Sequence, residues 1–269
     1  MADRPSPSIG PRAGSWPATL ELLIGKGLQL GSYIEIGSAD GYASLSFWCA
    51  GLLRGVTVVN IDANPIYEPS LRKIRDAIGG EYRICAVDEQ PGTLELNLSS
   101  HPYWGSAVAP DDPYWDSING QSGETITVPC RTLDSIVEEL KLEPPYAIKL
   151  DIQGLEARAL RSGPRALAEA AVVISEVIVH NFREVNAVME AAGFELFDLT
   201  DAQPAADGSL GWFYATYLHS DYAGLRSNAH WDPGTTGDVI ERQRQRREAV
   251  LAEIDKLVAG IGAQKNQRG

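Results

Sequence analysis

The sequence predicts an α/β fold in which a largely parallel β-sheet carries helices on both faces. Apolar, strand-length segments alternate with helical patterns along most of the chain, and this alternation is typical of parallel sheets. A glycine turn follows the first predicted strand, and the last two strands have the pattern of a hairpin, which would give a seven-stranded sheet one antiparallel strand. The predicted strands lie near residues 32–36, 56–61, 82–87, 145–150, 171–179, 194–199 and 211–218.

The first predicted strand, 32–36, runs into a glycine turn and then into a helical stretch over residues 42–53. Gly37 and Gly41 permit positive φ angles and the close approach of a ligand to bare backbone, and Asp40 is placed to cap the helix. The G-x-G-x-x-G pattern of dinucleotide sites is missing. The turn therefore predicts either a cofactor that has an adenosine but no pyrophosphate, or an ordinary strand-to-helix connection.

An acidic residue follows each of the next two predicted strands. Asp62 ends the second strand, where a carboxylate can accept hydrogen bonds from both hydroxyls of a ribose. Asp88 follows the third strand, where it could receive the amino group of an adenine. Ligands of such sheets bind beyond the carboxyl ends of the strands, so we expect Gly37, Asp62, Asp88, Asp151 and His180 to share one crevice.

Four blocks make the chain resemble the FkbM family of S-adenosylmethionine-dependent methyltransferases. They are Glu35/Gly37/Gly41, Asp62-Ala63-Asn64-Pro65, Thr132-Leu133-Asp134 and Lys149/Asp151/Gly154/Glu156. The resemblance covers roughly residues 32–218, and one departure is Ala39, where the family commonly has Asn. It implies the Rossmann-like class I methyltransferase sheet and S-adenosylmethionine as the cofactor. The cofactor-binding residues that we expect are Glu35, Gly37, Ser38, Gly41, Asp62, Ala63, Asp88 and Asp151.

Transfer of a methyl group to a hydroxyl requires alignment of the acceptor and a base for its proton. Asp151 is a candidate for both tasks, whereas His180 has the better-suited unperturbed pKa and is the favoured base, with His101 as a third candidate. Lys149 and Glu176 are ionisable residues inside apolar strands, so we expect them to be paired, either as a structural ion pair between the fourth and fifth strands or as a catalytic pair. The expected catalytic set is Asp151, His180 and Lys149. No spacing demands a metal, and a divalent ion is left unassigned.

The regions outside the predicted sheet divide the chain into three parts. Residues 1–31 form a loop and a helix that could cap the cofactor crevice. Residues 32–218 form the methyltransferase domain, with an aromatic insertion at 97–121 that we interpret as a substrate lid. Residues 219–269 form an extension with an amphipathic helix that could pack on a second subunit.

Composition narrows the choice of partners and of compartment. The chain has 23 basic and 36 acidic residues, a net charge of −13, which argues against nucleic acid and anionic membranes as partners. Cys49, Cys85 and Cys130 lack metal-ligand spacing and lie in or beside apolar segments, so buried thiols in a reducing compartment are expected. Neither a signal peptide nor a membrane span is apparent, and a cytoplasmic protein is expected.

These observations predict an O-methyltransferase that acts on a hydroxyl of a small molecule. A sugar or a polyketide-type secondary metabolite is the acceptor class that the resemblance implies. One alternative is an N-methyltransferase, because an amine can lose its proton after transfer. Another is a non-catalytic adenosine-binding module of the same fold, against which Glu35, Asp62 and Asp151 argue.

Overall fold

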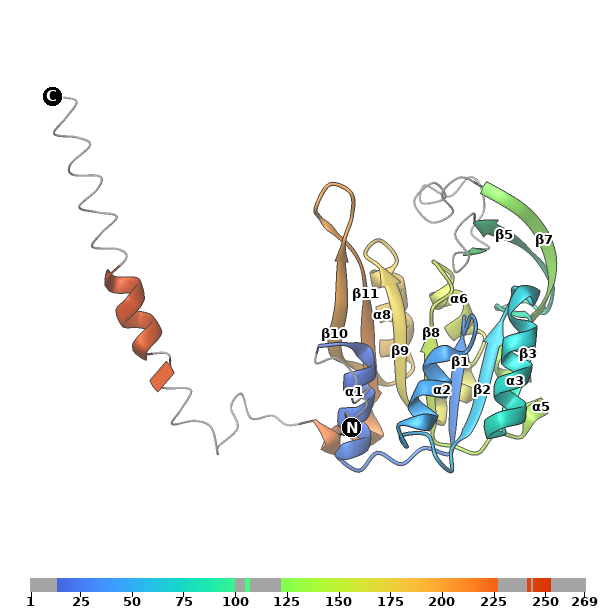
Figure 1. The fold of residues 1–269 in the computed structure, drawn as a ribbon, viewed down its shortest axis with the longest axis horizontal. Coiled ribbons are helices and arrows are strands. Elements are labelled where there is room, and N and C mark those ends of the chain that lie inside the picture. Colours follow the sequence, from blue (N-terminus) through green and yellow to red (C-terminus); the bar gives the residue numbers. More distant parts are fainter. Residues whose placement is uncertain (1–13, 100–104, 107–121, 227–240, 243, 253–269) are drawn as a thin grey trace, which may run out of the picture. The chain divides into compact units, whose positions relative to one another are not determined.

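The computed structural model of the chain describes residues 14–99, 105–106, 122–226, 241–242 and 244–252. Contacts divide the chain into two compact units, residues 1–226 and 227–269. Within the first unit, the described residues form a seven-stranded sheet with helices on both faces and a separate four-stranded sheet (Figure 1). In the second unit, the described residues are helical, and Val250 and Leu251 are exposed. The other apolar residues of the amphipathic pattern predicted for this extension, Ile254, Leu257, Val258 and Ile261, lie outside the described residues.

The large sheet has the strand order β10-β11-β9-β8-β1-β2-β3. Its strands are β1 (Ser32–Ile36), β2 (Thr57–Asp62), β3 (Glu81–Ile84), β8 (Tyr146–Leu150), β9 (Ala170–Ile178), β10 (Phe194–Pro204) and β11 (Leu210–His219). Strand β11 runs opposite to the other six strands of this sheet. The predicted fold class is therefore confirmed, including the single antiparallel strand. The strand order reverses between β1 and β8, which is where a sheet of this type opens a crevice.

Two layers of helices cover the large sheet because its central strands are apolar on both faces. All five residues of β1 and of β8 are buried. One face carries α1 (Trp16–Gly25), α2 (Tyr42–Cys49) and α3 (Glu68–Ile78), with the short helix η1 (Pro65–Tyr67) before α3. The other carries α5 (Leu133–Leu140), α6 (Glu156–Arg161), α7 (Pro164–Ala168) and α8 (Phe182–Ala191) (Figure 1). A further short helix, η2 (Ser220–Leu225), follows β11.

The four-stranded sheet was not predicted. It consists of β4 (Ala86–Val87), β5 (Gly92–Ser99), β6 (Gly105–Ser106) and β7 (Ser122–Arg131), in the order β4-β7-β5-β6. The prediction of one strand over residues 82–87 was wrong, because the chain leaves the large sheet at Cys85 and enters the small one. The aromatic residues of the predicted lid lie outside the described residues.

Three local expectations are corrected by the structure. Helix α1 packs against β10 and β11, and none of its residues lines the cavity described below, so it covers a face of the sheet and not the crevice. Gly41 occupies the N-cap position of α2, while Asp40 accepts a hydrogen bond from the Ser70 hydroxyl at 2.9 Å. Cys49 is exposed, whereas Cys85 and Cys130 are buried as expected.

Among the described residues, none of the helices combines the length and the apolar character that crossing a membrane would require.

Candidate active site

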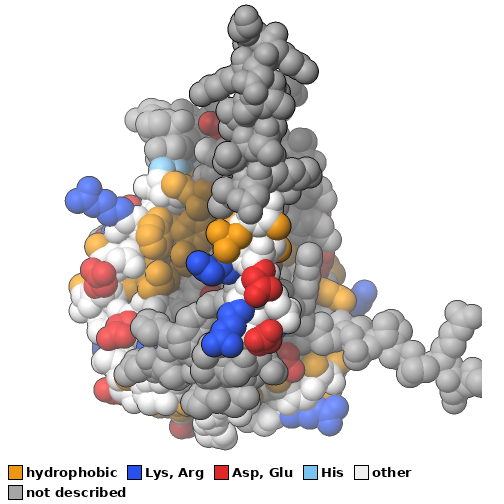
Figure 2. All heavy atoms as spheres, turned by 90° about the vertical axis from the view of Figure 1, so that its left-hand side faces the viewer, with side chains coloured by type: hydrophobic (Ala, Val, Ile, Leu, Met, Phe, Trp, Pro, Cys, Tyr) orange, Lys and Arg blue, Asp and Glu red, His pale blue; other side chains and the backbone are white. Residues whose placement is uncertain are grey.

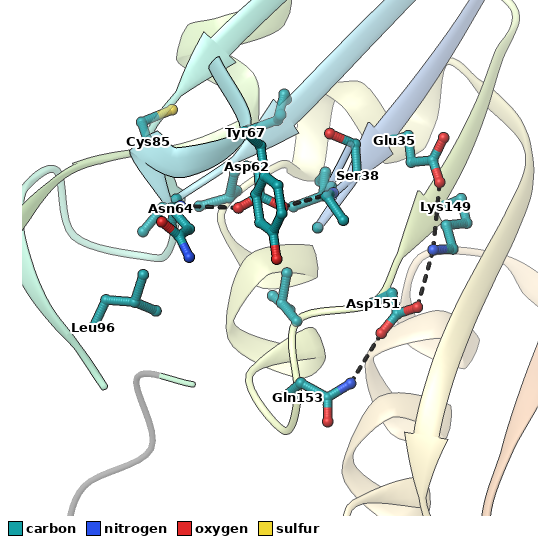
Figure 3. A pocket seen from close by; sticks show the side chains of 18 of the residues that line it. Glu35, Ser38, Asp62, Asn64, Tyr67, Cys85, Leu96, Lys149, Asp151 and Gln153 are labelled. Atoms are coloured by element: carbon teal, nitrogen blue, oxygen red, sulfur yellow. Dashed lines mark hydrogen bonds and ion pairs between the residues drawn. The ribbon is translucent and has the colours of Figure 1, made fainter. Parts of the chain in front are cut away.

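A cavity of about 600 Å³ opens at the carboxyl ends of β1, β2 and β8, beside the reversal of strand order. One end is polar and includes Glu35, Ser38, Lys149, Asp151 and Gln153 (Figure 3). The other end is mainly apolar and includes Ala63, Cys85, Ala86, Val87, Leu94 and Leu96, with the side-chain amide of Asn64 beside them (Figure 3). Asp62 lies between the two ends (Figure 3). The cavity therefore changes character along its length.

The turn after β1 is held in an unusual backbone conformation by contacts within the protein. Gly37, Ala39 and Gly41 have φ angles of 77°, 47° and 73°. A Cβ at Gly37 would lie 1.9 Å from the carbonyl oxygen of Asp151, and one at Gly41 would lie 2.8 Å from Ile74 Cδ1. We expected these glycines to expose bare backbone to a ligand, but the structure fills the space with its own atoms. Glycine is required at 37 because the turn packs against the loop after β8, and at 41 because it packs against side chains of α3.

Asp62 fastens this turn to the end of β2. Its Oδ2 accepts the Ala39 amide at 2.8 Å, and its Oδ1 accepts the Asn64 amide at 2.8 Å (Figure 3). Burial raises the pKa of Asp62 to about 6 despite these hydrogen bonds. Each carboxylate oxygen keeps a lone pair for another donor, so Asp62 can also accept the two hydroxyls of a ribose.

Lys149 is the buried cation of the polar end. Its Nζ lies 3.4 Å from Glu35 Oε1 and 3.1 Å from Asp151 Oδ2, and it stands 5.5 Å and 5.7 Å from the ring centroids of Trp16 and Tyr214. Burial acts to lower the pKa of Lys149, but Asp151 and Glu35 outweigh it and raise the pKa. The expected ion pair with Glu176 is thus corrected, since Lys149 pairs with carboxylates of β1 and of the loop after β8.

Asp151 is held from several sides. Its Oδ2 accepts the Tyr214 hydroxyl at 2.6 Å, and its Oδ1 accepts the Gln153 amide at 3.0 Å. The same Gln153 nitrogen donates to Glu176 Oε2 at 2.7 Å, so one side-chain amide links the carboxyl groups of Asp151 and Glu176.

This environment shifts the pKa values of Asp151 and Glu176 in opposite directions. Burial acts to raise the pKa of Asp151, but Lys149 and the hydrogen bonds from Glu176 and Tyr214 lower it below the usual range. Burial and the charge of Asp151 raise the pKa of Glu176 well above the usual range. Asp151 is therefore the carboxyl group of this pair that ionises more readily, and Glu176 the one that keeps a proton more readily.

Glu156 shapes the loop that carries Asp151 and Gln153. Its Oε1 accepts the amides of Ile152 and Gly154, both at 3.1 Å, and its Oε2 accepts the side-chain amide of Asn181 at 3.0 Å. Burial raises the pKa of Glu156 to about 7. Glu156 thus fixes the loops after β8 and β9 relative to each other and does not line the cavity.

The Thr132-Leu133-Asp134 block has a structural role in the described residues. The Thr132 hydroxyl accepts the Ser135 amide at 3.2 Å and so caps α5. Asp134 accepts the Ala166 amide at 2.9 Å, which ties α5 to α7. Neither residue lines the cavity.

Most of the residues predicted for the site lie together at the cavity, but three do not. The cavity is lined by Glu35, Gly37, Ser38, Asp62, Ala63, Lys149 and Asp151, and not by Gly41, Asp88 or His180. Both carboxylate oxygens of Asp88 accept hydrogen bonds from Arg158, so its expected role with adenine is not supported by its position. His180 is half-buried in the turn after β9, because the strand ends at Ile178. His101 lies outside the described residues.

Sequence reasoning missed several residues of the site. Gln153 and Tyr214 hold Asp151, and Leu94 and Leu96 form part of the apolar end. The alternation of leucines with polar residues over 93–98 was a signal for a strand that could have located the last two.

The cavity fits an adenosine that carries a charged amino-acid tail. Its apolar end suits an adenine, Asp62 suits the ribose, and the polar end offers buried atoms that still lack partners. Glu35 Oε2 and Ser38 Oγ have no hydrogen-bond partner among the described residues, and both side chains line the cavity. No cluster of three or more potential metal ligands occurs within the part of the chain that the structure describes.

Exposed apolar side chains gather on the β10–β11 hairpin. Leu199, Leu210 and Trp212 are all exposed there. Figure 2 shows apolar side chains gathered on this side of the molecule. Trp212 packs edge-to-face on Tyr214 with 6.1 Å between ring centroids, and Tyr214 in turn binds Asp151. The exposed end of β11 is thus linked to the polar end of the cavity by two aromatic rings.

Comparison with known proteins gives one family match. The model of the methyltransferase FkbM domain matches residues 35–196. A search of curated proteins found no significant match.

Several solved methyltransferases are similar to the chain at low sequence identity. Methyltransferase FkbM from Methylobacillus flagellatus KT is 17% identical over 72% of this chain and 45% of that chain, with a TM-score of 0.46. The present chain thus spans less than half the length of that protein. A precorrin-6y C5,15-methyltransferase from Geobacter metallireducens GS-15 is 12% identical over 76% of this chain and 88% of that chain, with a TM-score of 0.40. An O-methyltransferase from Bacillus cereus, solved in complex with SAH, is 15% identical over 77% and 84%, with a TM-score of 0.41.

Proposed function

Because the chain belongs to the FkbM methyltransferase family, we propose that it is an S-adenosylmethionine-dependent methyltransferase that acts on a hydroxyl of a small molecule. The observation that carries this proposal is the Asp151 carboxylate. It lines the cavity that fits the cofactor, and Lys149, Tyr214 and Gln153 orient it. An ionised carboxylate at that position can accept a hydrogen bond from a hydroxyl and then its proton.

The chain's own residues would hold the cofactor along the length of the cavity. We assign the adenine to the apolar end that includes Leu94 and Leu96, and the ribose to Asp62. Glu35 Oε2 and Ser38 Oγ are the acceptors available to the ammonium of the amino-acid tail. When bound, S-adenosylmethionine supplies a methyl group activated by a sulfonium charge. Asp151 would then lie at the border between cofactor and acceptor.

Asp151 replaces His180 as the proposed base. His180 was favoured for its unperturbed pKa, but it does not line the cavity, whereas Asp151 does. Lys149 keeps Asp151 ionised and, with Tyr214, fixes the direction of its lone pairs. Lys149 and Tyr214 are therefore positioning residues in this proposal.

The acceptor proposed is a sugar or a polyketide-type metabolite. Support comes from Trp212, an exposed aromatic ring at the end of β11 that is packed on Tyr214. Such a ring can stack on the face of a sugar or on an apolar ring system. We further propose that the enzyme acts in the cytoplasm on free small molecules, and that the extension at 219–269 mediates self-association. The net charge of −13 and the apolar spacing of the extension support these two points.

Methyl-labelled S-adenosylmethionine tests the proposal with a panel of hydroxylated sugars and macrolide aglycones and with the matching amino sugars. We expect label in alkali-stable methyl ethers. Asp151→Asn should lower transfer by about a hundredfold or more, with cofactor affinity changed only severalfold in calorimetry. His180→Gln is the matched control and should retain transfer close to that of the wild type. Label only in amines would identify an N-methyltransferase, and binding without any transfer would identify a binding module.

A further inference from the structure

The polar end of the cavity holds more carboxyl groups than cations. Glu35 and Asp151 form ion pairs with the ammonium of Lys149, and the side chains of Glu35, Lys149 and Asp151 are 2%, 6% and 22% exposed. Glu176 lies behind the lining and is linked to Asp151 through Gln153. Glu176 is itself 7% exposed. Ionisation of all three acids would leave buried negative charge without compensation, which is strongly unfavourable. At least one of these carboxyl groups must therefore hold a proton in the cofactor-free protein.

The geometry identifies Glu176 as the group that holds the proton. Glu35 and Asp151 each form an ion pair with Lys149, whereas no lysine or arginine among the described residues forms one with Glu176. The groups that face Glu176 are Asp151 on the loop after β8, Glu156 on α6 and Lys149 on β8, with Tyr214 opposite it on β11. Two of these are acids, so they favour the neutral form of Glu176. The Gln153 nitrogen donates to both Asp151 and Glu176 and so holds their carboxyl groups near each other, where two negative charges would repel and one proton removes the repulsion.

We propose that Asp151 and Glu176 form a carboxyl pair that changes its protonation with the charge of the cofactor. The pair holds one proton in the cofactor-free enzyme and releases it when the cationic cofactor binds. During methyl transfer, the pair takes up the proton of the acceptor hydroxyl. The inference rests on the proposed function, because it requires a hydroxyl acceptor.

Atoms and charges balance over the cycle. On binding, the proton that Glu176 shares with Asp151 leaves to solvent. In the transfer step, Asp151 accepts the hydroxyl proton while the O–C bond forms and the C–S bond breaks, and the electron pair of the C–S bond stays on sulfur. The pair then holds one proton again beside a neutral thioether. One proton is released in each turnover, at the binding step, and the net charge of the polar end together with the sulfur is the same in all three states.

Gln153 gives the pair a fixed geometry. Its side-chain nitrogen donates to both carboxyl groups, at 3.0 Å and 2.7 Å, so the two groups stay together whether they hold one proton or none. Its backbone φ of 55° lies in the left-handed region, which a residue other than glycine rarely adopts. The contacts of Glu156 with the neighbouring amides hold the loop in this conformation. Gln153 is thus a positioning residue for the pair.

Calorimetry in two buffers of different ionisation enthalpy counts the protons that leave on binding. At neutral pH we expect S-adenosylmethionine to release about one proton more than S-adenosylhomocysteine, whose sulfur is neutral. Glu176→Gln keeps the shape and can still accept the hydrogen bond from Gln153, but it has no carboxyl proton to lose, so the excess should vanish. Glu195→Gln, an exposed change on β10 of the same sheet, should keep it. Because the amino group of the cofactor can itself exchange protons, the quantity that decides is the difference between the wild type and Glu176→Gln.

Infrared difference spectra of the wild type give a second measurement that needs no variant. The carbonyl band of a protonated carboxyl group should disappear on addition of S-adenosylmethionine and remain on addition of S-adenosylhomocysteine. Equal proton release with both ligands, or an unchanged band, overturns the carboxyl pair while leaving the methyltransferase proposal intact. A protein that binds neither ligand would overturn both. Methyl transfer to amines alone would overturn the proton-uptake half of the inference.

Discussion

The two ends of the cavity are built by different means. The polar end belongs to the large sheet, where Lys149, Glu35 and Asp151 are buried together and held by ion pairs and hydrogen bonds. The apolar end lies where the chain passes from the large sheet to the small one, and Leu94 and Leu96 contribute to it by packing alone. Each buried charge at the polar end is compensated by the others. The contribution of each residue to stability therefore depends on its partners, and in this sense the residues act as a set. At the apolar end each side chain contributes in proportion to its own area.

The largest expected effect comes from removing the cation of the polar end. Lys149→Met leaves Glu35 and Asp151 buried without their partner, and we expect it to lower the free energy of unfolding by about 3–5 kcal/mol in urea titrations at neutral pH. The deficit should shrink as the pH falls, because Lys149 contributes to lowering the pKa of Asp151, and without it the carboxylates take up protons more readily. Lys73→Met, an exposed change on α3, should have little effect. A loss no larger than in that control would show that the residues do not act as a set.

A smaller effect is expected at Asp62, which lies between the two ends of the cavity, and it concerns the affinity for the ligand. We expect Asp62→Asn to weaken S-adenosylhomocysteine binding by about 1–3 kcal/mol, because a charged acceptor of the ribose hydroxyls is lost. Burial raises the pKa of Asp62 to about 6, so the wild-type affinity should fall as the pH is lowered through that value. The Asn variant should lack this dependence. If calorimetry gave the wild type and the Asn variant the same pH dependence of affinity, Asp62 would not be the residue that binds the ribose.

A substitution at the apolar end should weaken the binding of a charged and of a neutral ligand by the same amount. Leu94→Ala removes apolar area from the cavity wall, and we expect S-adenosylmethionine and S-adenosylhomocysteine to lose the same affinity, about 1 kcal/mol. Leu98→Ala, on the same strand but not at the cavity, is the matched control. If the two ligands lost different amounts, the separation of the two ends by charge would be wrong.

The smallest effect concerns the turn that joins the two ends. Ala39 has a φ of 47°, which costs energy for any residue with a Cβ. Ala39→Gly should therefore raise the free energy of unfolding by about 0.5–1 kcal/mol, even though glycine adds entropy to the unfolded chain. Ala43→Gly, within α2, should lower it by a similar amount. A loss of stability in both variants would mean that the turn is not strained at Ala39.

The large sheet could be predicted from the sequence because its central strands are short apolar runs with acidic residues at their carboxyl ends. Glu35, Asp62 and Asp151 were found in the same way, since their type and their place at a strand end define a role. The small sheet could not be predicted with the same signals. Its main pair joins β5 to β7 across the aromatic insertion, and one face of β5 lines the cavity, so its leucines did not stand out as a core strand.

Other errors follow from details of chain direction and register. Tyr214 reaches Asp151 because β11 is antiparallel and places Tyr214 opposite Glu176, a register that is not encoded in local sequence. His180 was expected at the crevice, but β9 ends at Ile178 and the turn carries His180 away from the cavity. Asp88 follows a strand of the small sheet, where Arg158 binds it. Residue type alone does not distinguish a carboxylate that is available from one that is already paired.

The contact between Gly37 and the Asp151 carbonyl also bears on how the protein acquires its site during synthesis. The turn after β1 leaves the ribosome early, but its shape depends on a backbone atom of the loop after β8, far later in the chain. Strand β8 must first take its place between β1 and β9. A nascent chain that ends before β8 contains Asp62 and the residues of the apolar end of the cavity but lacks Lys149, Asp151 and the carbonyl against which Gly37 packs, so we expect the cofactor to bind only after β8 is in place. Its stabilising effect falls on the finished domain, as slower unfolding rather than faster folding.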